Sequence, residues 1–528
     1  MAKHSDTLYA FYDLAVNPNC FDVVKFVVLA DLARREAGCR DLHILFVPSE
    51  GEGFREDDQF EQANREWRFR NIMLPICSLM PSCKGVTVCA SRSEAEYVET
   101  EMAEHIFPEG HSTEQPVQLF EWSEVAVASV QGKEIPSLVV GGQARAFVED
   151  WIAARAKGRK VISITLREMG FQSERNSRLD DWLAFIRGLD QGEYMPVIIR
   201  DTDSIFVKQS AEFDGVIQFP ETALNIELRA AFYEACYLNL MVSNGPIELC
   251  ALNTKIRYLM FKVYPEAWAK DRTHGGLPEA AVPKDGQLPI AGPHQRFIWS
   301  DDRLDVIRSE FAAMIKFLAE NEAEVEAFRA RSSFPPTKMQ CIDVLNLLAS
   351  SNRLNGCKAI LNHLDGSGNI GRIFKDVIRI YRNNVNPPQE MRDILFVLCL
   401  AFPDRMESCG KIFERITASS DPRKIAKYVL ILGDAHAALG EFDASIRCYR
   451  LAFEKCGDMN VALLKLGIIY EQMEKWDEAE EVLRDAISGG LHHRDVYNKY
   501  AQILRNQGKL KEAVEVSLRA FALDSSPA

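Results

Sequence analysis

Three arginines follow an apolar segment, residues 160–166, that has the composition of a buried strand. Arg167 stands at the end of this segment, and Arg175 and Arg178 come shortly after it. A guanidinium group is a planar fork that binds two phosphate oxygens at once. We therefore expect Arg167 and Arg175 to hold the diphosphate of a ligand. The alternative is a solvated loop whose arginines pair with the acidic residues around them.

A second candidate for anion binding follows the apolar segment 237–242. Ser243, Asn244 and Gly245 form a turn there, and Pro246 suits the first turn of a helix. Glycine lets a ligand approach the backbone, and the free N–H groups at the start of a helix attract an anion. Together with Arg167, this turn is a candidate phosphate site; alone it is an ordinary strand-to-helix turn.

Asp201 and Asp203 follow a third apolar segment, residues 195–200. The Asp-x-Asp pattern coordinates a divalent metal and a nucleotide-sugar diphosphate in one class of glycosyltransferases. A metal would require further oxygen ligands, and the sequence identifies none. We therefore expect no metal here. In that case Asp201 either caps a loop or approaches the ribose of a nucleotide.

Nearer the N-terminus, Asn17, Asn19 and Asp22 follow the first apolar segment, residues 8–14, and open a helical pattern. Asp22 is the candidate general base for an acceptor hydroxyl. Its other possible role, which the position favours, is a contact with the helix dipole. Asn17 and Asn19 either contact a sugar or cap the helix.

The segments that carry these residues alternate between strand and helix patterns. Strands are predicted at 8–14, 42–47, 85–89, 137–140, 160–166, 195–200 and 237–242, and helices at 21–35, 180–189, 224–235 and 302–331. Strand, turn, helix and strand in succession indicate a parallel sheet, whose ligands bind at the carboxyl ends of the strands. The α/β part is thus predicted to contain two Rossmann-like domains, residues 1–155 and 156–334.

The last hundred residues repeat with a period of 34. Small residues recur at corresponding positions: Gly433, Gly467 and Ala501, then Ser445, Ala479 and Ala513. Such residues let two antiparallel helices pack closely, and the pattern resembles the tetratricopeptide repeat. We expect irregular helical repeats at 335–426 and three regular repeats at 427–528. This α-solenoid would hold a peptide or protein on its concave surface.

Composition excludes several classes of function. The 528 residues include 76 acidic and 62 basic ones, for a net charge of -14, which argues against general nucleic-acid binding and against docking on anionic membranes. The 13 cysteines lack a Cys-x-x-Cys pair, which is typical of reduced thiols in a cytosolic protein. No apolar run is long enough to span a bilayer, so we expect a cytoplasmic protein.

Three consecutive strand ends, at Arg167, Asp201 and Ser243-Asn244, follow one another as in the nucleotide-binding half of GT-B glycosyltransferases. The segment is similar to the fucosyltransferase-like group in particular. The resemblance implies that Arg167 holds the pyrophosphate, that Ser243, Asn244 and Gly245 line the donor site, and that Asp201 or Asp203 lies near the nucleoside. The sequence departs from that group at the His that often precedes its Arg, where Thr165-Leu166 stands here, and at its Ser-Ser pair. The resemblance therefore does not identify the donor sugar or its nucleotide.

The expected function is a metal-independent glycosyltransferase that needs no cofactor besides its nucleotide-sugar donor. Domain 156–334 would bind the donor, and domain 1–155 would face the acceptor, which we expect to be a protein recruited by the repeats. Arginines offset the charge of a leaving diphosphate without a metal. Two alternatives stand beside it: a non-catalytic scaffold whose α/β part has lost its activity, and a nucleotide-sugar epimerase or hydrolase.

Overall fold

The structure is a computed structural model that divides into two compact units, Met1–Leu348 and Ala349–Ala528. It describes residues 4–51, 53–55, 61–119, 121–204, 211–265, 276–277, 281–283, 285–339, 344, 360, 430, 433–434, 436–437, 442–455, 460–492 and 494–524. The irregular helical repeats predicted at 335–426 therefore lie almost entirely outside the described residues.

The described helices and helical turns of the first unit are α1 (Val23–Glu36), α2 (Gln62–Arg68), η1 (Phe69–Met73), α3 (Leu74–Cys77), α4 (Arg92–Tyr97), η2 (Val98–Met102), α5 (Trp122–Val130), α6 (Gly142–Ala156), η3 (Ser173–Arg175), α7 (Leu179–Gly188), η4 (Thr202–Ser204), η5 (Ala211–Phe213), α8 (Glu221–Leu224), α9 (Ile226–Ala235), α10 (Ile247–Ala251), α11 (Leu304–Glu320) and α12 (Glu322–Arg329). The long helix predicted at 302–331 is thus two helices, because α11 ends at Glu320 and Asn321 separates it from α12.

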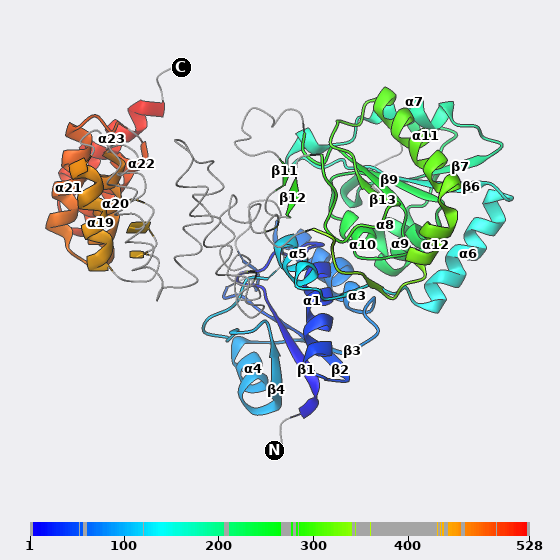
Figure 1. Cartoon of the computed structure of the whole chain (residues 1–528), viewed down its shortest axis with the longest axis horizontal. Coiled ribbons are helices and arrows are strands. Elements are labelled where there is room, and N and C mark those ends of the chain that lie inside the picture. Colours follow the sequence, from blue (N-terminus) through cyan, green and yellow to red (C-terminus); the bar gives the residue numbers. More distant parts are fainter. Residues whose placement is uncertain are drawn as a thin grey trace. The chain divides into compact units, whose positions relative to one another are not determined.

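The first sheet contains β1 (His4–Asp13), β2 (Asp41–Val47), β3 (Cys83–Val88) and β4 (Ala103–Phe107) in the order β3-β2-β1-β4, with every pair parallel. Because β2 and β4 flank β1, the chain winds first one way and then the other from β1 (Figure 1). The predicted strands 8–14, 42–47 and 85–89 are confirmed. In parallel α/β sheets, ligands bind where the winding reverses, here at the carboxyl ends of β1 and β4.

The prediction of a strand at 137–140 is wrong. β5 is only Ile135–Pro136, and it pairs antiparallel with β14 (Ser333–Phe334). The backbone N–H of Leu138 donates to Leu252, and that of Val139 donates to Leu79. These acceptors belong to different elements, so the segment is buried without forming a strand ladder. Through β14 the chain returns, at the end of the α/β part, to β5, and the two form a two-stranded sheet separate from the first one.

The second sheet contains β6 (Lys160–Thr165), β7 (Tyr194–Ile199), β8 (Ile217–Gln218), β9 (Leu238–Val242), β10 (Tyr258–Phe261) and β13 (Gln295–Phe297). Its order is β13-β10-β9-β6-β7-β8, and all its pairs are parallel. This is the strand order of a doubly wound dinucleotide-binding fold, with the reversal between β6 and β9. β6, β7 and β9 read as almost continuous apolar runs because helices cover both faces of such a sheet. β11 (Gly276–Leu277) and β12 (Val282–Pro283) form a separate two-stranded antiparallel sheet.

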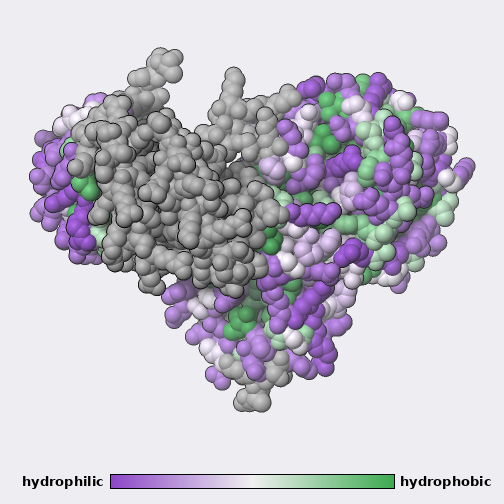
Figure 2. All heavy atoms as spheres, viewed as in Figure 1, coloured by the Kyte–Doolittle hydropathy of each residue, from purple (hydrophilic) through white to green (hydrophobic). Residues whose placement is uncertain are grey.

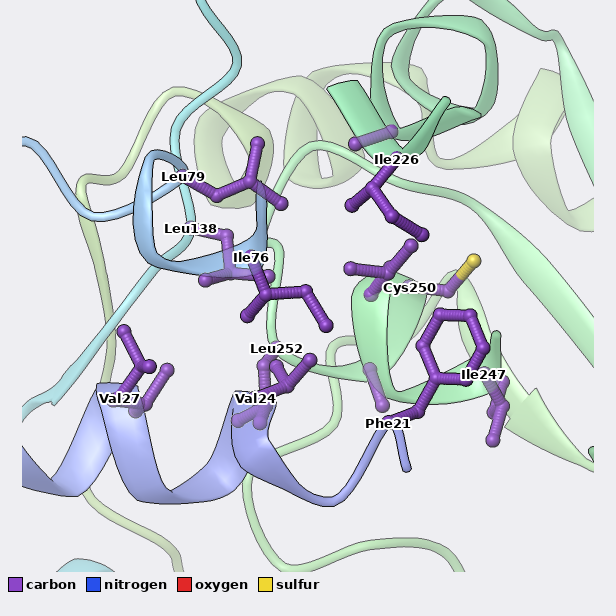
Figure 3. Packing of buried hydrophobic residues seen from close by; sticks show 14 of the residues in the cluster. Phe21, Val24, Val27, Ile76, Leu79, Leu138, Ile226, Ile247, Cys250 and Leu252 are labelled. Carbon is purple, nitrogen blue, oxygen red and sulfur yellow. The ribbon is translucent and has the colours of Figure 1, made fainter. Parts of the chain in front are cut away.

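One apolar core continues from the first sheet into the second. Phe21 and Val24, before and within α1, lie with Ile76 of α3 against Ile247 and Cys250 of α10 (Figure 3). Both sheets therefore share a buried cluster, in contrast to domains joined by a polar interface. A smaller core lies on the other face of the second sheet, between β6, β9, α7 and α11.

The second unit contains α19 (Phe442–Lys455), α20 (Asn460–Gln472), α21 (Trp476–Ser488), α22 (Arg494–Asn506) and α23 (Leu510–Asp524). A Cβ atom at Gly433 would lie 2.6 Å from the ring of Tyr449, and one at Gly467 would lie 2.7 Å from Leu483. The two contacts are one repeat apart, so the predicted role of the small residues in close helix packing is confirmed. Hydrophilic residues predominate over the visible coloured surface of the protein (Figure 2).

Candidate functional site

The predicted donor-site residues follow three strands that end side by side. Thr165 of β6 is in register with Ile199 of β7 and with Met241 of β9. The loops that begin after these residues therefore leave the sheet at the same edge. Arg175, in the loop after β6, donates to the backbone oxygen of Ser243 at 3.0 Å and to its hydroxyl at 3.3 Å. The structure thus brings these two predicted residues together where the winding of the sheet reverses.

Arg167 is buried in the same loop, with 3% of its surface exposed. Its guanidinium donates to the backbone oxygens of Gln172, at 2.9 Å, and Phe171, at 2.6 Å, and to Oδ1 of Asn176, at 2.5 Å. Every one of these acceptors is neutral. In this conformation Arg167 shapes its own loop, so a direct phosphate contact would require it to exchange some of these bonds.

The two arginines form a partly desolvated pair of like charges. Burial and the neighbouring Arg167 together lower the pKa of Arg175 to about 10, although Asp22 acts in the opposite direction. Burial also lowers the pKa of Arg167. Within the described residues neither guanidinium forms a salt bridge. A bound anion would relieve both the burial penalty and the repulsion.

Asp22 belongs to a buried charge cluster that also contains Lys25, Glu248 and Trp122. The Lys25 ammonium lies 2.5 Å from Asp22 Oδ1 and 3.1 Å from Glu248 Oε1, and the Trp122 indole donates to Glu248 at 3.2 Å. Two carboxylates, from α1's start and from α10, thus share one ammonium group. The cluster joins the first sheet's helices to those of the second.

The protonation states within this cluster follow from burial and pairing. Burial raises the pKa of Asp22, but Lys25, the Cys20 thiol and Arg55 together outweigh burial and hold this pKa below its ordinary value. Burial raises the pKa of Glu248. For Lys25 burial acts downward, yet the two carboxylates raise its pKa overall. A carboxylate with a lowered pKa is a weak proton acceptor at neutral pH, so the geometry favours a structural role for Asp22 over that of a general base.

Asn17 and Asn19 tie the loop after β1 to other loops. Asn17 donates to the backbone oxygen of Asp13 at 3.0 Å and accepts from the N–H of Leu119 at 2.9 Å. Asn19 donates to the backbone oxygen of Arg65 at 2.6 Å, and its buried Oδ1 has no hydrogen-bond partner. The interpretation that they cap the helix is wrong, because Asp22 occupies the N-cap position of α1, without a side-chain cap bond.

Asp201 connects the loops after β6 and β7. Its Oδ2 accepts from the N–H of Glu168 at 3.3 Å, and Glu168 in turn forms a salt bridge with Arg200 at 2.6 Å. This arrangement matches the loop-capping alternative. Asp203 lies in η4, and its side chain is outside the described residues. Across the described part of the chain, no three His, Cys, Asp or Glu side chains gather as a metal site would require.

The turn after β9 is shaped by contact with the first sheet's helices. A Cβ atom at Gly245 would lie 2.5 Å from the ring of Phe21, so only glycine fits without displacing that ring. Asn244 is buried, and its Oδ1 has no hydrogen-bond partner. α10 has five residues, too few for the helix start that we expected to attract an anion.

Lys25, Glu248 and Trp122 were not identified from the sequence as part of a site. For the two charged residues, however, the sequence contains a pattern that indicates burial. Lys25 interrupts the run Val23-Val24-Lys25-Phe26-Val27-Val28, and Glu248 interrupts an apolar run at 247–252. A charged residue inside an apolar helical run indicates a buried ion pair. Its partner does not follow from the sequence, since Lys25 and Glu248 are 223 positions apart.

Comparison with known proteins identifies the C-terminal part. Residues 462–494 and 495–527 each match a family model of the tetratricopeptide repeat, so these two segments are tetratricopeptide repeats. No curated protein matches the chain. None of the helices that the structure describes is long and apolar enough to cross a membrane.

Among solved structures, the chain is similar to the second tetratricopeptide repeat domain of Spaghetti (RPAP3) bound to the HSP90 peptide SRMEEVD. That likeness has 20% identity and a TM-score of 0.18, and it covers 19% of this chain and 91% of that one. A structure of MamA from MSR-1 has 15% identity and a TM-score of 0.22, covering 35% of this chain and 94% of that one. A second MamA crystal structure has 19% identity and a TM-score of 0.20, covering 33% and 90%.

Proposed function

We propose that the α/β part is a metal-independent glycosyltransferase whose repeats hold a protein acceptor. The donor would be a nucleotide sugar with its diphosphate at the carboxyl ends of β6 and β9. One observation carries this proposal: Arg167 and Arg175 lie together beside the Ser243 turn and bond only neutral acceptors. Two desolvated cations without carboxylate partners suit a ligand that brings two negative charges.

The chemistry of sugar transfer fits such a pair. Negative charge builds up on the diphosphate as the bond to the sugar breaks, and fixed cations stabilise it without a reorganisation step. Arg175 is the better placed residue for direct contact. Two of its three acceptors, the Ser243 hydroxyl and the Gln172 amide oxygen, belong to side chains that can rotate away, and the third is the backbone oxygen of Ser243. For Arg167 the proportion is reversed, because two of its three acceptors are backbone oxygens.

A thermal-shift screen with GDP, UDP, ADP and CMP and their sugars tests the proposal, because a ligand of the native state raises the melting temperature. We expect one nucleotide family to stabilise the protein and Arg175→Ala to abolish that effect. Arg178→Ala is the matched control, since Arg178 lies in the same loop, is largely exposed and pairs with Asp181. Stabilisation that survives Arg175→Ala would remove the arginine pair from the donor site.

A chelator tests whether sugar transfer depends on a divalent metal. We expect transfer to persist in excess chelator, since the arginines supply the positive charge. Loss of transfer in chelator, with recovery on adding Mn²⁺, would return Asp201 and Asp203 to a metal-binding role.

The non-catalytic scaffold is the second candidate, and one observation favours it: Arg167 and Asp22 are already satisfied by partners within the protein. It predicts no stabilisation by any nucleotide and no hydrolysis of any nucleotide sugar. The transferase predicts slow donor hydrolysis even without an acceptor. The two proposals therefore separate in the same screen.

A further inference from the structure

The helix α23 carries an exposed apolar stripe. Leu510, Val514 and Leu518 recur every four residues and are 64%, 59% and 63% exposed. Residues at this spacing lie on one face of a helix. Their exposure is unlike that of Ala513 and Ala520, which are buried on the opposite side against the rest of the repeat. The stripe is therefore an outward face that no described residue covers.

The period of 34 residues identifies the equivalent face of the preceding repeats, where the structure shows its contacts. The positions one repeat earlier are Trp476, Glu480 and Arg484 in α21. Glu480 is only 7% exposed because Lys509 of the following repeat pairs with it. Beside it, Asp477 accepts from Gln507 at 2.9 Å.

One repeat earlier, the same face also contacts the repeat that follows it, although Arg450 itself stays exposed. Arg450 in α19, at the position that corresponds to Arg484, donates to the Tyr470 hydroxyl of the following repeat at 2.8 Å. This face of the second helix is thus the surface on which the next repeat stacks. The stripe of α23 is the same stacking surface, with Val514 in place of Glu480. An exposed apolar stripe on a surface where helices stack indicates that another helix covers it.

We propose that the occupant is a second copy of this chain, which packs its own α23 antiparallel against this one. The stripe is symmetric about Val514, with a leucine four residues to either side. A two-fold axis at Val514 therefore places the two valines together and each Leu510 against the Leu518 of the other copy. An isologous contact needs such a self-complementary surface.

The charged residues beside the stripe support the same pairing. Lys511 and Glu515 are both exposed and follow the stripe on one side of the helix. The two-fold rotation places this side of one helix next to the same side of the other helix, with the two helices running in opposite directions. Lys511 of each copy therefore approaches Glu515 of the other. A stripe of three side chains is much smaller than a standard interface, which uses about 20–30 residues a side. The pair should accordingly dissociate on dilution.

Sedimentation equilibrium of the full chain over a range of concentrations tests this proposal. We expect a reversible monomer–dimer equilibrium that Val514→Glu shifts to monomer, because two carboxylates would meet on the axis. Val461→Glu is the matched control, since Val461 is an exposed valine of α20 outside the stripe. A wild-type protein that stays monomeric throughout, or one that grows beyond a dimer, would overturn the proposal. So would a dimer that Val514→Glu leaves intact.

A charge-reversal mixture separates loss of the interface from loss of folding. Lys511→Glu and Glu515→Lys should each weaken the dimer, because each places like charges together in a homodimer. Mixing the two variants should restore it as a heterodimer, in which both contacts are attractive again. Two weakened variants that fail to associate when mixed would contradict the antiparallel arrangement, whatever their individual stability, which circular dichroism monitors.

Discussion

Replacing Lys25 with methionine tests the charge cluster between the two sheets. Methionine has nearly the same length but no charge, so it leaves Asp22 and Glu248 facing each other without their shared cation. Removing one partner of a buried ion pair typically costs about 3–5 kcal/mol, because the remaining charge stays buried and uncompensated. Here two carboxylates remain, so we expect a loss of stability of about 4 kcal/mol at neutral pH.

The loss should depend on pH in a defined direction. Lys25 helps to hold the pKa of Asp22 below its ordinary value, so in the wild type this carboxylate stabilises the folded state above its unfolded pKa. Without Lys25, the folded-state pKa of Asp22 rises above that of the unfolded chain, and the pKa of Glu248, which burial already raises, rises further. The penalty is then largest at neutral pH, and it shrinks as the pH falls through those raised values toward about 4–5 and the carboxylates take up protons.

Urea unfolding followed by tryptophan fluorescence measures the effect, with the midpoint compared at neutral pH and near pH 5 at an unchanged slope. The matched control is Lys133→Met, because Lys133 pairs with Glu36 at the surface, where their side chains are 35% and 47% exposed. Exposed pairs contribute about 0–1 kcal/mol, so the control should unfold almost as the wild type does. A loss below about 1 kcal/mol for Lys25→Met, or a loss equal at both pH values, would refute this account of the cluster.

Two further predictions use other features of the chain. Gly245→Ala should destabilise the first unit by about 1–3 kcal/mol through overpacking against Phe21; the companion change Phe21→Leu should recover part of the loss in the same unfolding assay, and simple additivity of the two would show that they are not in contact. Deletion of 427–528 should spare hydrolysis of the donor and weaken modification of a protein acceptor, as followed by sugar release and by mass spectrometry. Loss of donor hydrolysis as well would mean that the repeats support the α/β part structurally.

Much of the fold could be predicted because the signals are local. The strands at 160–166, 195–200 and 237–242 are continuous apolar runs, and the repeats place small residues at fixed intervals. The segment 137–140 has the same apolar composition, yet it is not a strand, since its backbone bonds go to Leu79 and Leu252. Burial of a segment is therefore predictable from its composition, whereas pairing depends on distant backbone groups.

In the candidate site, the positions of the residues could be predicted but their partners could not. The strand ends that carry Arg167, Asp201 and Ser243 could be predicted, because parallel strands end at one edge of a sheet. The partners could not: Arg167 bonds backbone oxygens at 171 and 172, whose direction depends on the loop and not on residue type. The need for glycine at 245 arises from Phe21, which is more than two hundred positions earlier.

The apolar core shared by the two sheets also bears on how this chain is synthesised. The first sheet is complete once β4 has left the ribosome, but α10, which covers Phe21 and Val24, is made much later. More than a hundred residues separate them, so at about 5–20 residues per second the apolar side of α1 stays uncovered for roughly 7–30 s. During that interval the nascent chain exposes this apolar surface to solvent. We therefore expect chaperones that bind nascent chains to bind this surface.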